Sequence, residues 1–214
     1  MTSLTDLILV AVVLTNFALM GMSRLSMNVR VCALQGTALG LLPLTVGEHG
    51  ITIRAVIFTV LILGLKGYLF PKLLMRSIRA ANARSEDVPI VGYAASMILG
   101  ILILWLSFWL SSGFPLIRPA VSRLVLPLAL STILIGLFLI MSRRTAVMQV
   151  VGYLVLENGI FIFGVALAQE EPFLVELGVL LDVFVAVFVM GIAIFHINRE
   201  FDHIDVDQLS SLRD

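Results

Sequence analysis

The chain has 214 residues, of which 60% are hydrophobic and only 13% are charged, and its mean hydropathy is +1.09. Soluble domains are about half apolar and a quarter charged, so the composition predicts an integral membrane protein. The 14 basic and 14 acidic residues balance and form no basic face, which argues against a nucleic-acid partner.

Seven apolar stretches are long enough to cross a bilayer, because a hydrocarbon core of about 30 Å needs roughly 20 residues of helix. We therefore predict an all-α fold, an integral membrane bundle of seven transmembrane helices. The first stretch follows no basic segment, so we expect a retained span and not a signal peptide. Too few residues lie outside the stretches to form a soluble catalytic domain. The predicted spans are 4–22, 27–46, 51–75, 90–111, 120–141, 147–168 and 173–196.

The basic residues of the short loops predict the orientation of the bundle, because cytoplasmic loops are enriched in lysine and arginine. Ten basic residues fall on one side of the predicted spans and three on the other. With seven spans, this count places the N-terminus outside and the C-terminus in the cytoplasm. The richer side holds Arg24, Arg30, Lys72, Arg76, Arg79, Arg84, Arg143, Arg144, Arg199 and Arg213, and the poorer side holds Arg54, Arg118 and Arg123.

Glu157 lies at the middle of the sixth predicted span, where a charge costs about 2.5–3.5 kcal/mol on insertion scales. Gln149, Tyr153 and Glu157 are four residues apart and share one helix face, while Gly152 and Gly159 allow another helix to approach. We interpret this stripe as a path for protons or water from the cytoplasm to mid-membrane. The alternative is a protonated Glu157 that makes an interhelical hydrogen bond, with Tyr153 as an anchor.

Lys66 is the only basic residue that lies away from both ends of a predicted span. Pro71 cannot donate to the Gly67 carbonyl and clashes with it, so we predict a kink in the third span. Gly64 and Gly67 loosen the same turn, and a charged residue at a helix break is a recurring device for ion handling in membranes. The alternative is that the lysine extends its ammonium to the cytoplasmic interface.

The seventh predicted span holds two further carboxylates. Asp182 lies slightly outward of its middle, and we predict a second protonatable site there. Glu176 lies six residues earlier and points about 120° away on a helix, nearer the outer surface. It fits an outer relay site and an interfacial carboxylate in reach of water equally well.

The cysteine and histidine content predicts that this chain binds no cofactor or metal itself. Cys32 is the single cysteine and cannot form an internal disulfide or hold an iron–sulfur cluster, which needs about four thiolates. We expect it to be a small buried apolar side chain. His49, His196 and His203 fall in a loop, at a span end and in the tail, not at matching depths as haem ligation requires.

Three motifs carry a resemblance to a known family. The motifs are GYLVLENG at 152–159, LVELGVLLDVFVAVFVM at 174–190 and IDVDQLSSLRD at 204–214, and LKGYLFP adds a characteristic lysine-to-proline spacing. On these motifs the chain resembles the E-type membrane subunit of hydrogenase-4 and formate-hydrogenlyase complexes, the group 4 membrane-bound nickel–iron hydrogenases. Its last three spans also resemble the small three-helix antiporter-like subunit of respiratory complex I. The resemblance to that subunit places its first glutamate at Leu154 here, so we do not carry over its proton partners.

The resemblance implies a non-catalytic subunit of a redox-driven complex in a prokaryotic inner membrane. It implies antiporter-like and anchor subunits as membrane partners, and hydrophilic hydrogenase subunits with a nickel–iron centre and iron–sulfur clusters on the cytoplasmic side. Glu157, Asp182 and Lys66, with Tyr153 and Gln149, would then serve proton or sodium translocation. The alternatives are a redox-independent multisubunit cation/proton antiporter and a structural scaffold. We divide the chain into a four-helix part (1–119), a three-helix antiporter-like part (120–197) and a cytoplasmic tail (198–214).

Overall fold

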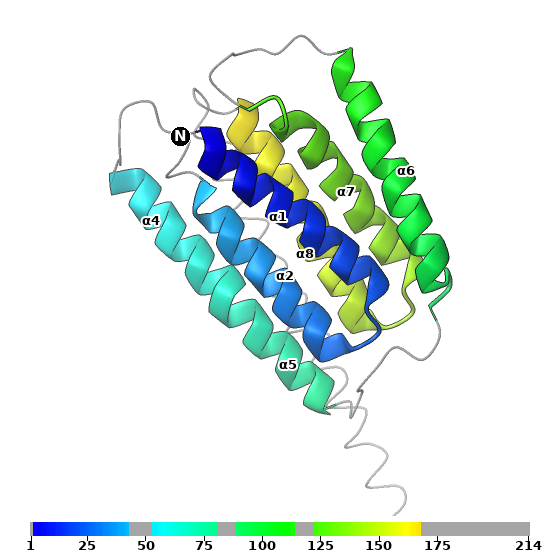
Figure 1. Ribbon diagram of the computed structural model, residues 1–214. Coiled ribbons are helices and arrows are strands. Elements are labelled where there is room, and N and C mark those ends of the chain that lie inside the picture. The colour runs from blue at the N-terminus through cyan, green and yellow to red at the C-terminus, as the bar shows by residue number, and fades with distance from the viewer. Residues whose placement is uncertain (1, 43–52, 81–88, 114–121, 168–214) are drawn as a thin grey trace, which may run out of the picture.

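A computed structural model of the chain describes residues 2–42, 53–80, 89–113 and 122–167 (Figure 1). Every regular element in these ranges is a helix, which confirms the predicted all-α fold for the described part of the chain. In a bilayer, a helix satisfies its backbone hydrogen bonds internally, which is why apolar sequence of this length folds this way. The elements are α1 (Thr2–Gly21), α2 (Leu25–Gly40), α4 (Ile53–Ile62), the π-helix η1 (Leu63–Leu69), α5 (Phe70–Ala80), α6 (Tyr93–Ser112), α7 (Val125–Ser142) and α8 (Ala146–Leu167).

Four of the described helices, α1, α6, α7 and α8, are long and apolar enough to cross a membrane. The chain is therefore a multi-pass membrane protein. Helix α2 has 16 residues, and the predicted second span continues beyond it into residues that the structure does not describe. The predicted third span is a continuous helical run, Ile53 to Ala80, that changes type twice. The predicted seventh span and the tail lie outside the described residues, and the division into three parts stays a prediction.

The helix type changes directly before Pro71, where the sequence predicted a kink. In η1 the Phe70 N–H donates to the carbonyl of Leu65, five residues back, instead of four as in an α-helix. Proline removes one hydrogen bond and crowds the preceding turn, and a wider turn accommodates both effects. The helix does not end at Pro71, because α5 continues through it. Lys66 lies at the centre of the π-helix.

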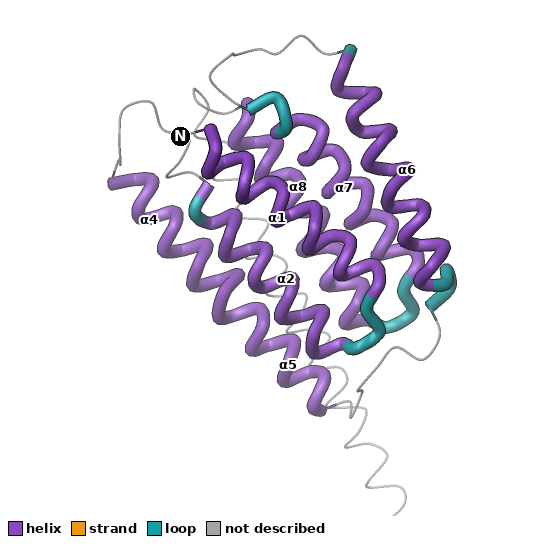
Figure 2. The backbone as a smooth tube through the Cα atoms, viewed as in Figure 1, coloured by secondary structure: helices purple, strands orange, loops and turns teal. Residues whose placement is uncertain are grey.

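With α4, η1 and α5 taken as one continuous run, successive described helices run in opposite directions along the bundle. Figures 1 and 2 show that α1, α5 and α7 end, and α2, α6 and α8 begin, at the same end of the bundle. The short turns at this end contain Arg24, Arg143 and Arg144. Arg123 precedes α7 at the opposite end. We call the end that contains Arg24, Arg143 and Arg144 the arginine end of the bundle.

Helices α7 and α8 approach each other through glycines. A Cβ atom on Gly159 would lie 2.6 Å from the backbone nitrogen of Ile133, and one on Gly152 would lie 2.8 Å from that of Ile140. Gly136 faces the backbone of Leu156 in the same way. The predicted role of Gly152 and Gly159 in close helix approach is confirmed. Small residues commonly allow this contact between membrane helices.

We expect Gly159→Ala to destabilise the chain by about 1–3 kcal/mol, because the methyl group would push the α7 backbone away. Gly164→Ala is the matched control in the same helix, since a Cβ there meets nothing within 4 Å. Unfolding of the purified chain in a detergent titration measures both variants. Equal stability of the two variants would contradict the close packing of α7 on α8.

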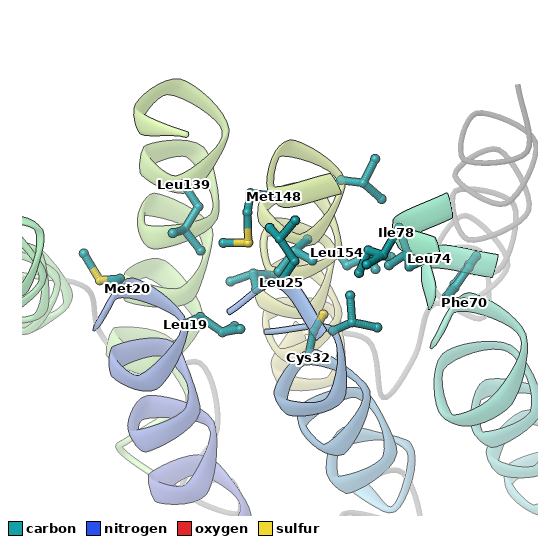
Figure 3. Packing of buried hydrophobic residues seen from close by; sticks show 14 of the residues in the cluster. Leu19, Met20, Leu25, Cys32, Phe70, Leu74, Ile78, Leu139, Met148 and Leu154 are labelled. Carbon is teal, nitrogen blue, oxygen red and sulfur yellow. The ribbon is translucent and has the colours of Figure 1, made fainter. Parts of the chain in front are cut away.

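The core consists of two apolar clusters with a polar layer between them. The cluster nearer the arginine end includes Leu19 and Cys32 (Figure 3), and the other includes Val12 and Leu39. Cys32 is buried as expected. Helices α1, α2, α7 and α8 each pass from one cluster to the other, and each carries a buried polar residue at the crossing. These residues are Asn16, Gln35, Thr132, Glu157 and Asn158.

Candidate functional site

Lys66 and Glu157 form an ion pair inside the bundle. The Lys66 Nζ atom lies 2.9 Å from Oε1 of Glu157, and the two residues are only 6% and 3% exposed. The ammonium therefore lies against a carboxylate of the same chain and does not extend to the membrane interface. Removing two charges from water costs several kcal/mol per ion, and their mutual attraction offsets this only with good geometry and further hydrogen bonds.

Two glycines bring the lysine-bearing turn against α2. A Cβ on Gly36 would lie 2.8 Å from the Cβ of Lys66, so the aliphatic stem of the lysine occupies the space above Gly36. A Cβ on Gly67 would lie 2.7 Å from Cγ2 of Thr37, which places the same turn close to α2 from the other side. The Phe161 ring of α8 lies 5.8 Å from Nζ. These contacts hold the lysine stem between α2 and α8.

Asn158 gives Lys66 a second acceptor and connects it to three more helices. Lys66 Nζ donates to Oδ1 of Asn158 at 2.9 Å, and Nδ2 of Asn158 donates to Oε1 of Gln35 at 3.2 Å. Gln35 Nε2 donates to Oδ1 of Asn16 at 2.7 Å, and Asn16 Nδ2 donates to Oγ1 of Thr132 at 3.0 Å. We call Asn158, Gln35, Asn16 and Thr132 the polar chain. All four are at most 1% exposed, and they link η1, α8, α2, α1 and α7.

A small cavity adjoins Lys66 on the side of the arginine end. Its volume is about 10 Å³, which is room for about one water molecule. The α2 residues that line it lie between Gln35 and the start of that helix, so the cavity lies on the arginine-end side of Lys66. Leu154 of α8 lines the same cavity. Its walls are Val29, Cys32, Ala33, Lys66, Phe70, Pro71, Leu74, Leu154 and Asn158.

The comparison with known proteins decides the family. Hydrogenase-4 component E of Escherichia coli K12 is 30% identical over 148 residues, which are 69% of this chain and 68% of that protein. Hydrogenase-4 component E of Shigella flexneri matches to the same extent. The chain belongs to the hydrogenase-4 component E family.

Further matches extend this result along the chain. An uncharacterized protein of Mycobacterium tuberculosis is 34% identical to this component E family member over 187 residues, 87% of this chain and 85% of that protein. Residues 124–214 match the family of NADH-ubiquinone/plastoquinone oxidoreductase chain 4L. The resemblances to both families that the motifs indicated are confirmed. No solved structure matches the chain.

The predicted stripe of Gln149, Tyr153 and Glu157 is only partly continuous in this component E chain. Glu157 is buried in the ion pair, and Tyr153 is half-buried against the apolar cluster near the arginine end. Gln149 is exposed, and its Nε2 donates to the Arg143 carbonyl at 3.2 Å, where it caps the turn before α8. The polar contacts of Glu157 and Asn158 lead sideways into other helices. Asp182 and Glu176 lie outside the described residues, so their roles stay predictions.

The residues that sequence reasoning missed are neutral or lie at a helix end. Asn16, Gln35 and Thr132 each stand inside a predicted span, and that position was the signal that could have found them. Arg143 is fully buried, donates from Nη2 to the Met20 carbonyl at 2.6 Å and lies over the Tyr93 ring, 4.9 Å from its centroid. It ties α1 and α6 to the turn between α7 and α8.

Proposed function

We propose that the chain couples a redox reaction in partner subunits to the movement of protons or sodium ions, with the Lys66–Glu157 pair as the central charge site. The observation that carries this proposal is a buried ion pair in the polar layer between two apolar clusters. Membership of the hydrogenase-4 component E family supports the assignment as a membrane subunit of a redox-coupled complex.

Stability alone gives no reason for an ion pair at this depth. Replacing a buried pair with well-packed apolar residues is often neutral or stabilising by about 1–4 kcal/mol. Ionisable residues inside membrane spans are rare and commonly mark ion pathways. A dry surrounding favours the neutral forms of both groups, whereas each charge stabilises the other. Such opposing effects allow a small change in a neighbouring subunit to move a proton.

The other carboxylate and polar residues have supporting roles in this proposal. Asp182 is a second protonatable site, and Glu176 is an outer one. Tyr153 and Gln149 lie between Glu157 and the arginine end along α8. The cavity beside Lys66 lies on the same side and has room for about one water molecule, which supports entry of water or a proton from that side.

We propose that seven spans place the arginine end of the bundle in the cytoplasm, with the N-terminus outside, in a prokaryotic inner membrane. The alternating helix directions and the arginines at one end support this orientation (Figure 1). We expect a cysteine at Arg144 to be shielded from a membrane-impermeant thiol reagent in intact cells, and a cysteine at Arg123 to be labelled. Both positions are exposed and flank α7, and Cys32→Ala removes the native thiol. The reverse labelling pattern would overturn the orientation.

We propose that the partners are a hydrophilic hydrogenase module on the cytoplasmic side and antiporter-like and anchor subunits in the membrane. The nickel–iron centre and the iron–sulfur clusters would belong to those partners. Gentle detergent purification of a tagged full-length chain, followed by mass spectrometry, tests this composition. Hydrogenase subunits in the sample are the expected result, and antiporter subunits without a redox protein would favour the independent antiporter.

Reconstitution of the purified complex in vesicles tests the coupling itself. We expect electron transfer to change the internal pH, or to accumulate sodium, in a way that an ionophore for the moved ion abolishes. Electron transfer without any ion movement would reduce the chain to a scaffold between larger membrane subunits.

A further inference from the structure

The hydrogen bonds of the polar chain all run in one direction. An ammonium can only donate, so Asn158 must turn its Oδ1 toward Lys66 and its Nδ2 toward Gln35. Gln35 must then accept with Oε1 and donate with Nε2, and the same constraint passes to Asn16. The Lys66 ammonium therefore sets one direction for three buried amides on three helices.

The far end of the polar chain agrees with this direction. Thr132 accepts from Asn16 and donates its own proton to the Leu128 carbonyl at 2.7 Å. The second N–H of Gln35 faces the Val12 carbonyl at 3.3 Å, as it does only if Nε2 lies on the α1 side. Every amide therefore presents its oxygen toward Lys66 and its nitrogen away from it. In a dry interior, aligned hydrogen bonds of this kind polarise one another.

We propose that Gln35, Asn16 and Thr132 are positioning residues that act through Asn158 to hold Lys66 as an ammonium on the carboxylate of Glu157. The polar chain orients the Asn158 oxygen toward the ammonium and strengthens it as an acceptor. Without that orientation, the Lys66 ammonium transfers one proton from Nζ to Oε1 of Glu157, which leaves a neutral amine and a neutral carboxylic acid. The charge state of the site then depends on α1 and α7, which do not touch it through their own charged groups.

The simpler interpretation is that these amides only connect helices. Interhelical hydrogen bonds in membranes contribute stability of their own. The two interpretations differ in the protonation of Glu157. A connecting role predicts lower stability with an unchanged carboxylate, whereas a positioning role predicts a protonated Glu157 even in a folded variant.

Infrared spectroscopy of the purified full-length chain at neutral pH distinguishes them, because a protonated carboxylic acid absorbs separately from a carboxylate. Glu157→Gln assigns the signal. We expect no Glu157 acid band in the wild type, a clear band in Gln35→Leu and a weaker band in Thr132→Val. Asn28→Leu is the control for Gln35, since Asn28 is also a buried amide of α2 and donates to the Met22 carbonyl at 3.1 Å outside the polar chain. It should show no band.

Ser131→Ala is the control for Thr132→Val, and it keeps the test informative if Gln35→Leu fails to fold. Ser131 also donates to the Leu128 carbonyl, at 2.9 Å, but lies outside the polar chain. A band already present in the wild type, equal bands in variants and controls, or no band in Thr132→Val would each overturn the proposal. The inference adds to the charge site proposed above, yet the band reports protonation without ion movement. A chain that conducts nothing can therefore still confirm it.

Discussion

Glu157→Gln is expected to leave the complex assembled and to abolish coupled ion movement. Glutamine has the shape of glutamate, and its Oε1 still accepts from Lys66 Nζ, which lies 2.9 Å from Oε1 in the wild type. It cannot take up or release a proton, so any cycle in which Glu157 changes charge stops. The measurement is the ion movement per electron transferred in reconstituted vesicles. We expect this ratio to fall to the background of ionophore-treated vesicles while electron transfer continues.

Two further variants are compared with Glu157→Gln, one as a control and one as a milder change. Asp6→Asn makes the same kind of change at a half-buried carboxylate near the start of α1, far from the ion pair along the bundle, and should retain coupling. Tyr153→Phe should reduce coupling less than Glu157→Gln, because it removes one hydroxyl and leaves the acid. Wild-type coupling in Glu157→Gln would reduce Glu157 to a structural hydrogen-bond partner.

The sequence predicted the helices and the costly charges well, for a simple physical reason. Each apolar run must form a helix in lipid, and α8 at Ala146–Leu167 differs from the predicted span 147–168 by one residue at each end. A buried charge such as Lys66 or Glu157 is conspicuous because its cost is large. Asn16 and Gln35 cost less to bury, so their positions inside spans carried a weaker signal.

The sequence could not predict which residues would meet. Spacing along α8 places Gln149, Tyr153 and Glu157 on one face, but it does not say which helix lies opposite that face. Lys66 is the observed partner of Glu157. The π-helix before Pro71 carries this lysine, and Gly36 and Gly67 let the π-helix pack close to α2, so that the ammonium reaches the carboxylate on α8. Gln149 instead donates to the Arg143 carbonyl, since it lies in the first turn of α8, close to the end of α7.

Lys66→Met is expected to destabilise the chain by about 3–5 kcal/mol, because it leaves a buried carboxylate without its counter-charge. The Asn158 oxygen loses its donor at the same time, and the polar chain loses the cation that orients it. Glu157 is then expected to take up a proton, which keeps the loss toward the lower end of this range. Lys66→Arg retains the charge in a larger and planar group, and we expect a partial loss, since the space above Gly36 fits a lysine stem.

The double variant Lys66→Met with Glu157→Leu is the decisive comparison. Removing both charges leaves no uncompensated ion, and we expect its free energy of unfolding to exceed that of Lys66→Met and to approach or surpass the wild-type value. Coupled ion movement should nevertheless be absent, which would separate the stability of the fold from the function of the pair.

Lys72→Met is the control on the same helical run. Its ammonium is exposed and donates to the Tyr68 hydroxyl at 3.1 Å, so we expect a change within about 0.5 kcal/mol. A detergent titration of the purified chains gives these free energies. The single variant Glu157→Leu completes the comparison. If the loss of unfolding free energy in the double variant equals the sum of the losses in Lys66→Met and Glu157→Leu, the two residues contribute independently, and Lys66 does not compensate the charge of Glu157.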